Sequence, residues 1–116
     1  MLSRTVRKRA STPVQAEGQR STSSPVGSYI SAITQIRGST FYSPLTLKAS
    51  GAFAFKHGPS GTWTDTNGTV VMDGQLNTAP FVFTVKQVGR NLGSPARKGT
   101  ATEGGYPFGN WYAVRR

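Results

Sequence analysis

Residues 62–72 place the dipeptide Asn67-Gly68 between two stretches of β-prone residues. Asn and Gly tolerate the positive φ angles of a type I′ turn, whose twist matches that of the two strands it joins. The segment therefore predicts a hairpin. It is the strongest local signal in the chain, and it favours an antiparallel β fold over a helical one.

Alternating apolar residues predict further strands on both sides of this hairpin. Phe81, Phe83 and Val85 share one face of residues 81–88, and the partly apolar opposite face suits a central strand or a buried interface. Earlier in the chain, Leu45 alternates with Leu47, and Phe53 with Phe55. Each run ends at a turn signal, as expected for short strands.

Three other segments complete the expected order of elements. The dipeptide Asp73-Gly74 predicts a second turn, and the aromatic ending, residues 106–116, predicts a last strand. Residues 29–36 fit a strand or a short helix, because isoleucines recur every third residue while the β-branched content favours a strand.

Frequent turn residues fix the fold class. Gly and Pro occupy 14 + 7 = 21 of the 116 positions, and strand signals recur about every 8–12 residues. The sequence predicts an all-β fold, a small antiparallel barrel or sandwich of about five to six strands. Residues 28–116 are expected to form this compact β domain, and residues 1–27, which are rich in Ser, Thr and Arg, an extended basic arm.

The net charge of +10 favours a polyanionic partner or an acidic protein face. Residues 1–27 carry five basic side chains and one acidic, hence +4, and residues 28–116 carry nine and three, hence +6. The residues expected to dock on a polyanion or partner lie in the arm and in the last third of the chain: Arg4, Arg7, Lys8, Arg9, Arg20, Arg90, Arg97, Lys98, Arg115 and Arg116.

Several function classes find no support in the residues. No apolar stretch is long enough to span a membrane, and no apolar segment follows the charged start as in a secretory signal. The chain has no cysteine, one histidine (His57) and four dispersed carboxylates, so we expect no metal site, no cofactor and no enzymatic activity.

The segment 93–100 contains Gly, Lys and Thr in a short span, like a phosphate-binding loop. However, the order is permuted to Lys98-Gly99-Thr100, and Pro95 removes an amide donor. A solvated basic loop or a nonspecific phosphate contact explains it better than a nucleotide site.

Aromatic residues near the C-terminus are candidates for an interface. Four of them gather in a Gly-rich segment and fit the core and a subunit interface equally well: Tyr106, Phe108, Trp111 and Tyr112. Aromatic residues interleaved with basic ones also fit a stacking platform for single-stranded nucleic acid, although a small β domain needs its phenylalanines for the core.

The residues Gly61-Thr62-Trp63 resemble the Gly-x-Trp motif of calycin-type barrels, which bind small apolar ligands. The resemblance covers about ten residues. In that family the motif belongs to the first strand, whereas here it lies in mid-chain.

Three hypotheses follow. The first is a structural component of a large assembly, a virion, with copies of itself, other assembly proteins and nucleic acid as partners, located in the virion or the host cytoplasm. The second is a mitochondrial or ribosomal component, because the Arg- and Ser-rich, acid-poor opening has the composition of a transit peptide. The third is a free β-barrel that binds nucleic acid or a small ligand. The first is preferred because it uses both the arm and the lack of catalytic groups.

Overall fold

The computed structural model describes residues 24–116, which form an all-β fold. The strands in chain order are β1 (Gly27–Gln35), β2 (Thr40–Leu47), β3 (Ala52–Phe55), β4 (Ser60–Thr66), β5 (Thr69–Leu76), β6 (Ala79–Val88), β7 (Asn91–Leu92), β8 (Gly99–Glu103) and β9 (Tyr106–Arg115). Within these residues there is no helix long and apolar enough to cross a membrane.

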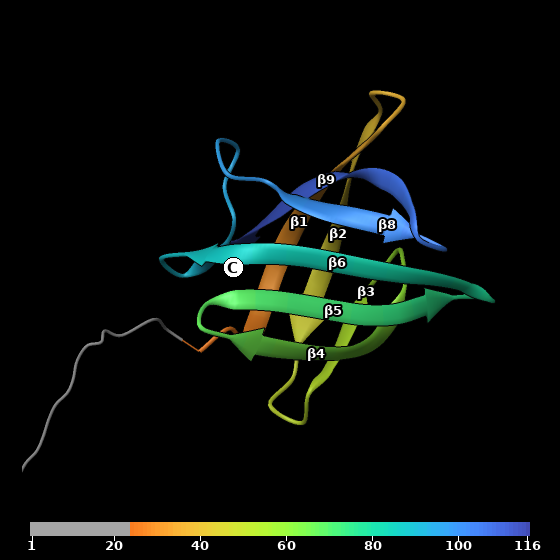
Figure 1. The fold of residues 1–116 in the computed structure, drawn as a ribbon. Helices are drawn as coiled ribbons and strands as arrows, with labels where there is room; N and C mark the ends of the chain where they lie inside the picture. Colours follow the sequence, from red (N-terminus) through yellow and green to blue (C-terminus); the bar gives the residue numbers. More distant parts are fainter. Residues whose placement is uncertain (1–23) are drawn as a thin grey trace, which may run out of the picture.

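The sheet closes on itself as an antiparallel barrel (Figure 1). Strands β1 to β6 follow one another as a meander, β6 pairs with β8, β8 with β9, and β9 returns to β1. The short β7 lies between the ends of β6 and β9. Eight strands thus complete the circuit, which confirms the predicted antiparallel barrel but exceeds the expected five to six strands.

The hairpin at Asn67-Gly68 is confirmed. Both residues have positive φ, 53° and 86°, as a type I′ turn requires. The turn expected at Asp73-Gly74 is wrong: both residues lie inside β5, opposite Thr62 and Gly61 of β4. Gly74 lacks a side chain because a Cβ there would come within 2.2 Å of the Ser60 carbonyl oxygen and 2.8 Å of the Phe53 ring. The glycine marks close packing rather than a turn.

Strand β8 is the main strand that the sequence did not predict, which is why the expected number of strands was too low. A Cβ at Gly99 would come within 2.2 Å of the Thr84 carbonyl oxygen and 2.7 Å of the Val85 Cβ. Ala101 is buried beside it, and these small residues leave the strand without an apolar pattern to recognise.

Residues 29–36 resolve as strand through residue 35, with inward Tyr29, Ser31 and Ile33. The inward serine obscures the alternation of this strand.

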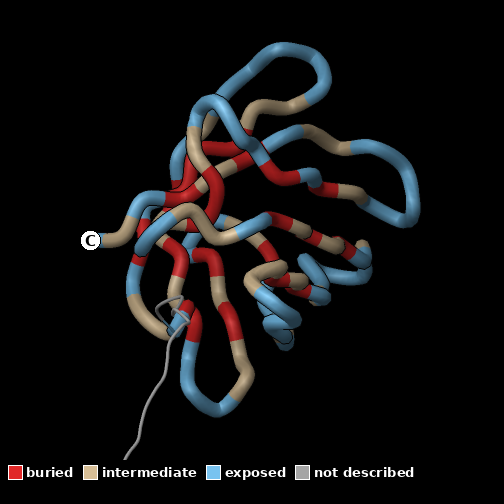
Figure 2. The backbone as a smooth tube through the Cα atoms, turned by 60° about the vertical axis from the view of Figure 1, so that its left-hand side comes forward, coloured by how far each residue is buried: buried red, intermediate tan, exposed pale blue. Residues whose placement is uncertain are grey.

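Side chains fill the barrel interior. Figure 2 shows buried residues alternating with less buried ones along the strands. Aromatic rings pack edge to face across it, with Trp111 5.5 Å from Phe83 and 6.3 Å from Phe55 between ring centroids. Phe55 also lies 4.8 Å from Phe83. Offset and edge-to-face aromatic contacts at these separations are favourable, so the interior is a packed core.

Candidate docking surfaces

The two ends of the barrel differ in charge. We call the end with the start of β1, the β4–β5 turn and the C-terminus the arm end, and the end with the β5–β6 and β8–β9 turns the turn end (Figure 1). The arm end carries Lys48, Lys86, Arg90, Arg97, Lys98, Arg115 and Arg116, and the turn end Arg37 and Lys56. The predicted docking residues Arg4, Arg7, Lys8, Arg9 and Arg20 lie outside the described residues.

Arg115 fastens the chain that leads into β1. Its side chain donates three hydrogen bonds to backbone carbonyl oxygens: Nη2 to Ser24 at 2.8 Å, Nη1 to Val26 at 2.5 Å and Nε to Arg90 at 3.1 Å. The Arg115 amide also donates to Oδ1 of Asn91 at 2.9 Å. The guanidinium thus joins residues separated by about ninety positions in the sequence.

Tyr29 completes this clamp from inside the barrel. Its ring lies 4.8 Å below the Arg115 guanidinium carbon, and its hydroxyl donates to the Pro25 carbonyl oxygen at 2.5 Å. Burial raises the pKa of the Tyr29 hydroxyl, and the charges of Arg115 and then Arg90 partly oppose that rise. The neutral hydroxyl is the form that donates to Pro25. Together, Arg115 and Tyr29 form what we call the arm clamp.

Gly27 allows the chain to run close beside the Arg115 side chain of the arm clamp. Its φ is +152°, and a Cβ at this position would lie 2.3 Å from Arg115 Nη1. Residues 24–26, which the sequence analysis assigned to the arm, are therefore attached to the barrel, and the root of the arm has a fixed position at the basic end.

A basic hollow lies at the arm end beside the loop after β7. It is lined by Lys86, Gln87, Val88, Arg97 and Lys98. Ser94 and Arg97 exchange backbone hydrogen bonds at 3.2 and 3.0 Å, and the Ser94 hydroxyl accepts from the Arg97 amide at 3.1 Å. The Gly93 amide donates to the Lys86 carbonyl oxygen at 2.8 Å. These bonds hold two cations of the loop next to a third on β6.

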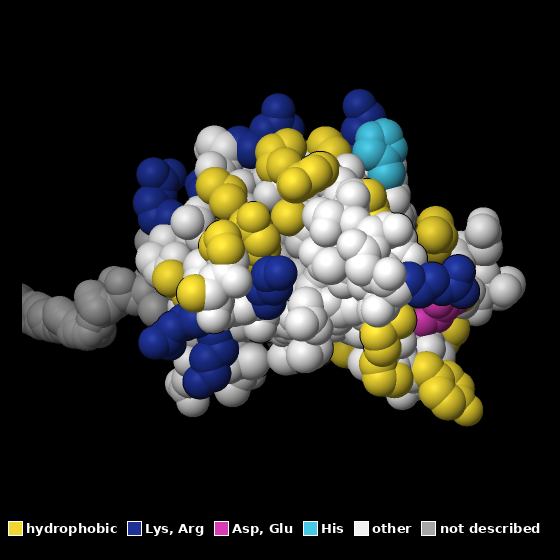
Figure 3. Space-filling view, turned by 90° about the horizontal axis from the view of Figure 1, so that it is seen from above, with side chains coloured by type: hydrophobic (Ala, Val, Ile, Leu, Met, Phe, Trp, Pro, Cys, Tyr) yellow, Lys and Arg dark blue, Asp and Glu magenta, His cyan; other side chains and the backbone are white. Residues whose placement is uncertain are grey.

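A second hollow adjoins the basic hollow and extends across β9 toward the β1–β2 turn; we call it the polar hollow for its hydroxyl and amide groups, although apolar residues such as Ile36 and Pro107 also line it. Its lining comprises Thr34, Gln35, Ile36, Gly38, Lys98, Pro107, Gly109 and Asn110. Lys98 lines both hollows, and we call the two together the Lys98 groove. Figure 3, seen from above, shows several Lys and Arg side chains on the left of this face and others along its upper edge and on its right.

Beside the polar hollow, the outer surface of β2, β1 and β9 is apolar and aromatic. Register places Pro44, Ile30 and Val114 side by side in one row, and Tyr42, Ala32 and Tyr112 in the next. Tyr42 is 66% exposed, and Ile30 and Val114 are also exposed. We call these two rows the apolar rows.

The predicted interface aromatics separate in the structure. Trp111 is fully buried and donates from Nε1 to the Thr100 carbonyl oxygen at 3.2 Å, so it belongs to the core. Phe108 is half-buried and packs edge to face on Phe81. Tyr112 is half-buried in the apolar rows, and Tyr106 is 77% exposed at the turn end.

Sequence reasoning missed Tyr42 and Lys86 as surface residues of interest. Tyr42 alternates with the inward Phe41 and Ser43, and Lys86 follows the inward Val85. Alternation therefore marked both as outward, but only the closed barrel places them beside Tyr112 and Lys98.

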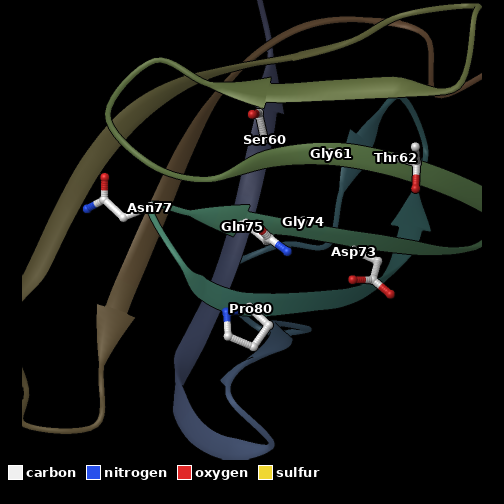
Figure 4. A pocket seen from close by; sticks show the side chains of 8 residues that line it. All are labelled: Ser60, Gly61, Thr62, Asp73, Gly74, Gln75, Asn77 and Pro80. Carbon is white, nitrogen blue, oxygen red and sulfur yellow. The ribbon is translucent and has the colours of Figure 1, made fainter.

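A third hollow lies on the outer face of β4 and β5 (Figure 4). Its lining is polar but holds one carboxylate, Asp73, with Ser60, Thr62, Gln75 and Asn77 around it. Among residues 24–116, no three His, Asp or Glu side chains come together as metal ligands. This hollow offers hydrogen-bonding groups without an acid and base pair.

Comparison of this chain with known protein families, with curated proteins and with solved structures gives no match. The functional argument therefore depends on the surfaces described above.

Proposed function

We propose that this protein is a structural component of a large assembly, a virion, in which the barrel packs on neighbouring subunits and the basic arm docks on those neighbours or on the genome. The observation that carries the proposal is the arm clamp. Arg115 and Tyr29 hold residues 24–26 to the barrel, so a partner gripped by the arm is held at a defined place relative to the barrel.

The surfaces of the barrel agree with this role. The row of Pro44, Ile30 and Val114 exposes the two large apolar side chains Ile30 and Val114 on one sheet face, which is the kind of surface that neighbouring subunits cover. The packed aromatic interior argues against a calycin-like ligand cavity, because Trp111, Phe55 and Phe83 occupy the space a ligand would need.

Light scattering after size-exclusion chromatography tests the proposal on the full chain, with and without a single-stranded oligonucleotide. We expect a mass many times the 12.4 kDa of one chain. The variant Arg4→Gln/Arg7→Gln/Lys8→Gln/Arg9→Gln should assemble less, because it removes the densest charge of the arm. The pair Lys48→Gln/Lys56→Gln, outside the arm, serves as the control. A 12.4 kDa monomer under every condition would contradict the proposal.

A second candidate is a free nucleic-acid-binding barrel, which the cations of the Lys98 groove favour. The same experiment separates the two candidates. A one-to-one complex with the oligonucleotide, without growth of the protein oligomer, would support the free barrel instead of the assembly component.

A further inference from the structure

The Lys98 groove has the chemical features of a track for a charged, base-bearing polymer. Lys86, Arg97 and Lys98 line its basic hollow, and none of the residues that line either hollow carries a carboxylate. Among the side chains of residues 24–116, the one carboxylate at the arm end is that of Asp65, which is engaged in its own hairpin, where Oδ1 accepts from the Gly68 amide at 3.0 Å. The groove is therefore an uncompensated positive site.

The second half of the groove supplies different groups. Thr34, Gln35 and Asn110 bring hydroxyl and amide groups to the polar hollow, and these can donate to or accept from sugars and base edges. Thr34 lies between Thr40 on β2 and Asn110 on β9, so all three strands present polar side chains here. Away from the cations, the groove thus presents neutral hydrogen-bonding groups together with apolar residues, Ile36 and Pro107.

Aromatic side chains border the polar hollow. The row of Tyr42, Ala32 and Tyr112 is two residues along the strands from the row of Thr40, Thr34 and Asn110. Two residues of a strand span about 7 Å, so the two tyrosines are within reach of a base held in the polar hollow. A cationic track with aromatic platforms is how proteins bind single strands without sequence preference.

We propose that the Lys98 groove binds single-stranded nucleic acid, with Lys86, Arg97 and Lys98 on the phosphates and with Tyr42 and Tyr112 stacking on bases. The inference rests on the proposed function and identifies nucleic acid as the partner that binds at this groove. A concave surface that presents hydroxyl and amide groups fits a flexible strand better than a flat anionic bilayer.

The first experiment tests the charges of the groove with the full-length variant Arg97→Gln/Lys98→Gln. Binding is measured by fluorescence anisotropy of a labelled single-stranded oligonucleotide of mixed sequence. Its length of about 20 nucleotides corresponds to roughly two binding sites. The slope of log binding constant against log salt should fall by about 1.4, since a single strand loses about 0.7 per phosphate contact. Lys48→Gln/Lys56→Gln removes the same charge away from the groove and should leave the slope close to that of the parent chain. Equal slopes in the two variants would overturn the inference.

The second experiment tests base stacking by comparing Tyr42→Ala with Tyr106→Ala. Both tyrosines are highly exposed, but only Tyr42 borders the groove. Loss of one stacked base should weaken binding roughly five- to hundredfold in Tyr42→Ala. Tyr106→Ala should bind as the parent chain does. Equal affinities of the two variants would overturn the stacking part of the inference.

Competition identifies the class of partner. An unlabelled oligonucleotide should displace the probe, whereas polyglutamate and phosphatidylserine vesicles at equal charge should not; efficient displacement by either would overturn the assignment to nucleic acid. The charge-conserving variant Arg97→Lys/Lys98→Arg should bind like the parent and keep its fold. If the arm variant abolishes assembly while the groove variants leave oligonucleotide binding unchanged, the groove inference fails and the proposed function stands.

Discussion

The two ends of the barrel are closed in different ways. At the arm end, Arg115 bonds to the carbonyl oxygens of Ser24 and Val26, residues 91 and 89 positions away in the sequence. At the turn end, β5 is joined to β6 by Asn77-Thr78 and β8 to β9 by Gly104-Gly105. The arm end also has a local turn, at Asn67-Gly68, but the start of β1 is held there by side chains that meet only after folding, whereas the two connections at the turn end depend on local backbone conformation.

The two ends therefore differ in how they can hold a basic arm. Local turns need no more than two residues with the right φ angles, so the turn end leaves Tyr106 exposed and without an anchoring role. The arm end uses a cation, a buried tyrosine and a glycine to fix a chain that enters from outside the sheet. Substitutions at the two ends should therefore differ in what they disturb.

The largest effect is expected from Arg115→Ala. It removes three hydrogen bonds and the contact with the Tyr29 ring, so the free energy of unfolding should fall by about 2 kcal/mol. Urea unfolding followed by tryptophan fluorescence measures it. Arg116→Ala, which removes the neighbouring cation, should change stability by less than about 0.5 kcal/mol. Equal losses of stability at the two positions would show that Arg115 stabilises the fold through its charge and not through the contacts of the clamp.

Tyr29→Phe should cost about 1 kcal/mol, because it deletes only the hydroxyl that donates to Pro25 and keeps the ring under Arg115. The same unfolding measurement applies. In the double variant Tyr29→Phe/Arg115→Ala, the free energy of unfolding should fall by less than the sum of the two single effects, because both residues hold the same segment. Strict additivity would argue against a single clamp.

At the turn end, Asn77→Ala should cost about 1 kcal/mol, because Asn77 has a φ of 58° that alanine adopts poorly. Asn77→Gly is the control and should unfold at nearly the parental urea concentration. Unlike the clamp variants, Asn77→Ala should leave residues 24–26 protected from proteolysis. Cleavage near residue 24 in this variant would mean that the two ends are coupled.

The smallest effect concerns pH. Because burial raises the pKa of Tyr29 above its ordinary value of 10.0, the unfolded chain loses this proton before the folded one does. Stability from this group is complete below about pH 10 and declines as pH rises toward the folded pKa. Urea unfolding between about pH 8 and 11 should show a shallower decline for Tyr29→Phe than for the parent, and identical slopes would speak against this contribution.

Much of the fold was predictable because it follows from local chemistry. The Asn67-Gly68 turn and the alternation of Phe81, Phe83 and Val85 each carry their own signal. The Asp73-Gly74 turn was mispredicted because a glycine that makes room for Phe53 looks, in sequence, like a glycine that makes a turn. Strand β8 went unrecognised because crowding by Thr84 and Val85 keeps its inward residues small.

The candidate surfaces were predictable only in part. The sequence marked Arg97 and Lys98 as a basic loop, and it marked Tyr112 as an aromatic of uncertain place. It gave no sign that Lys86 lines the same hollow, or that Tyr42 shares a row with Tyr112. Those neighbours come from the return of β9 to β1 and of β8 to β6, which are pairings between distant parts of the chain.

The all-β class, the antiparallel hairpins and the excess of positive charge follow from the amino-acid sequence alone, because turn propensity, alternation and ionisation are properties of short segments. The closure of the sheet, the place of Trp111 in the core and the clamp made by Arg115 depend on how the strands come together in three dimensions. Closure brings residues 24–26 and 115 together across the whole chain, and no local pattern encodes contacts between segments that far apart.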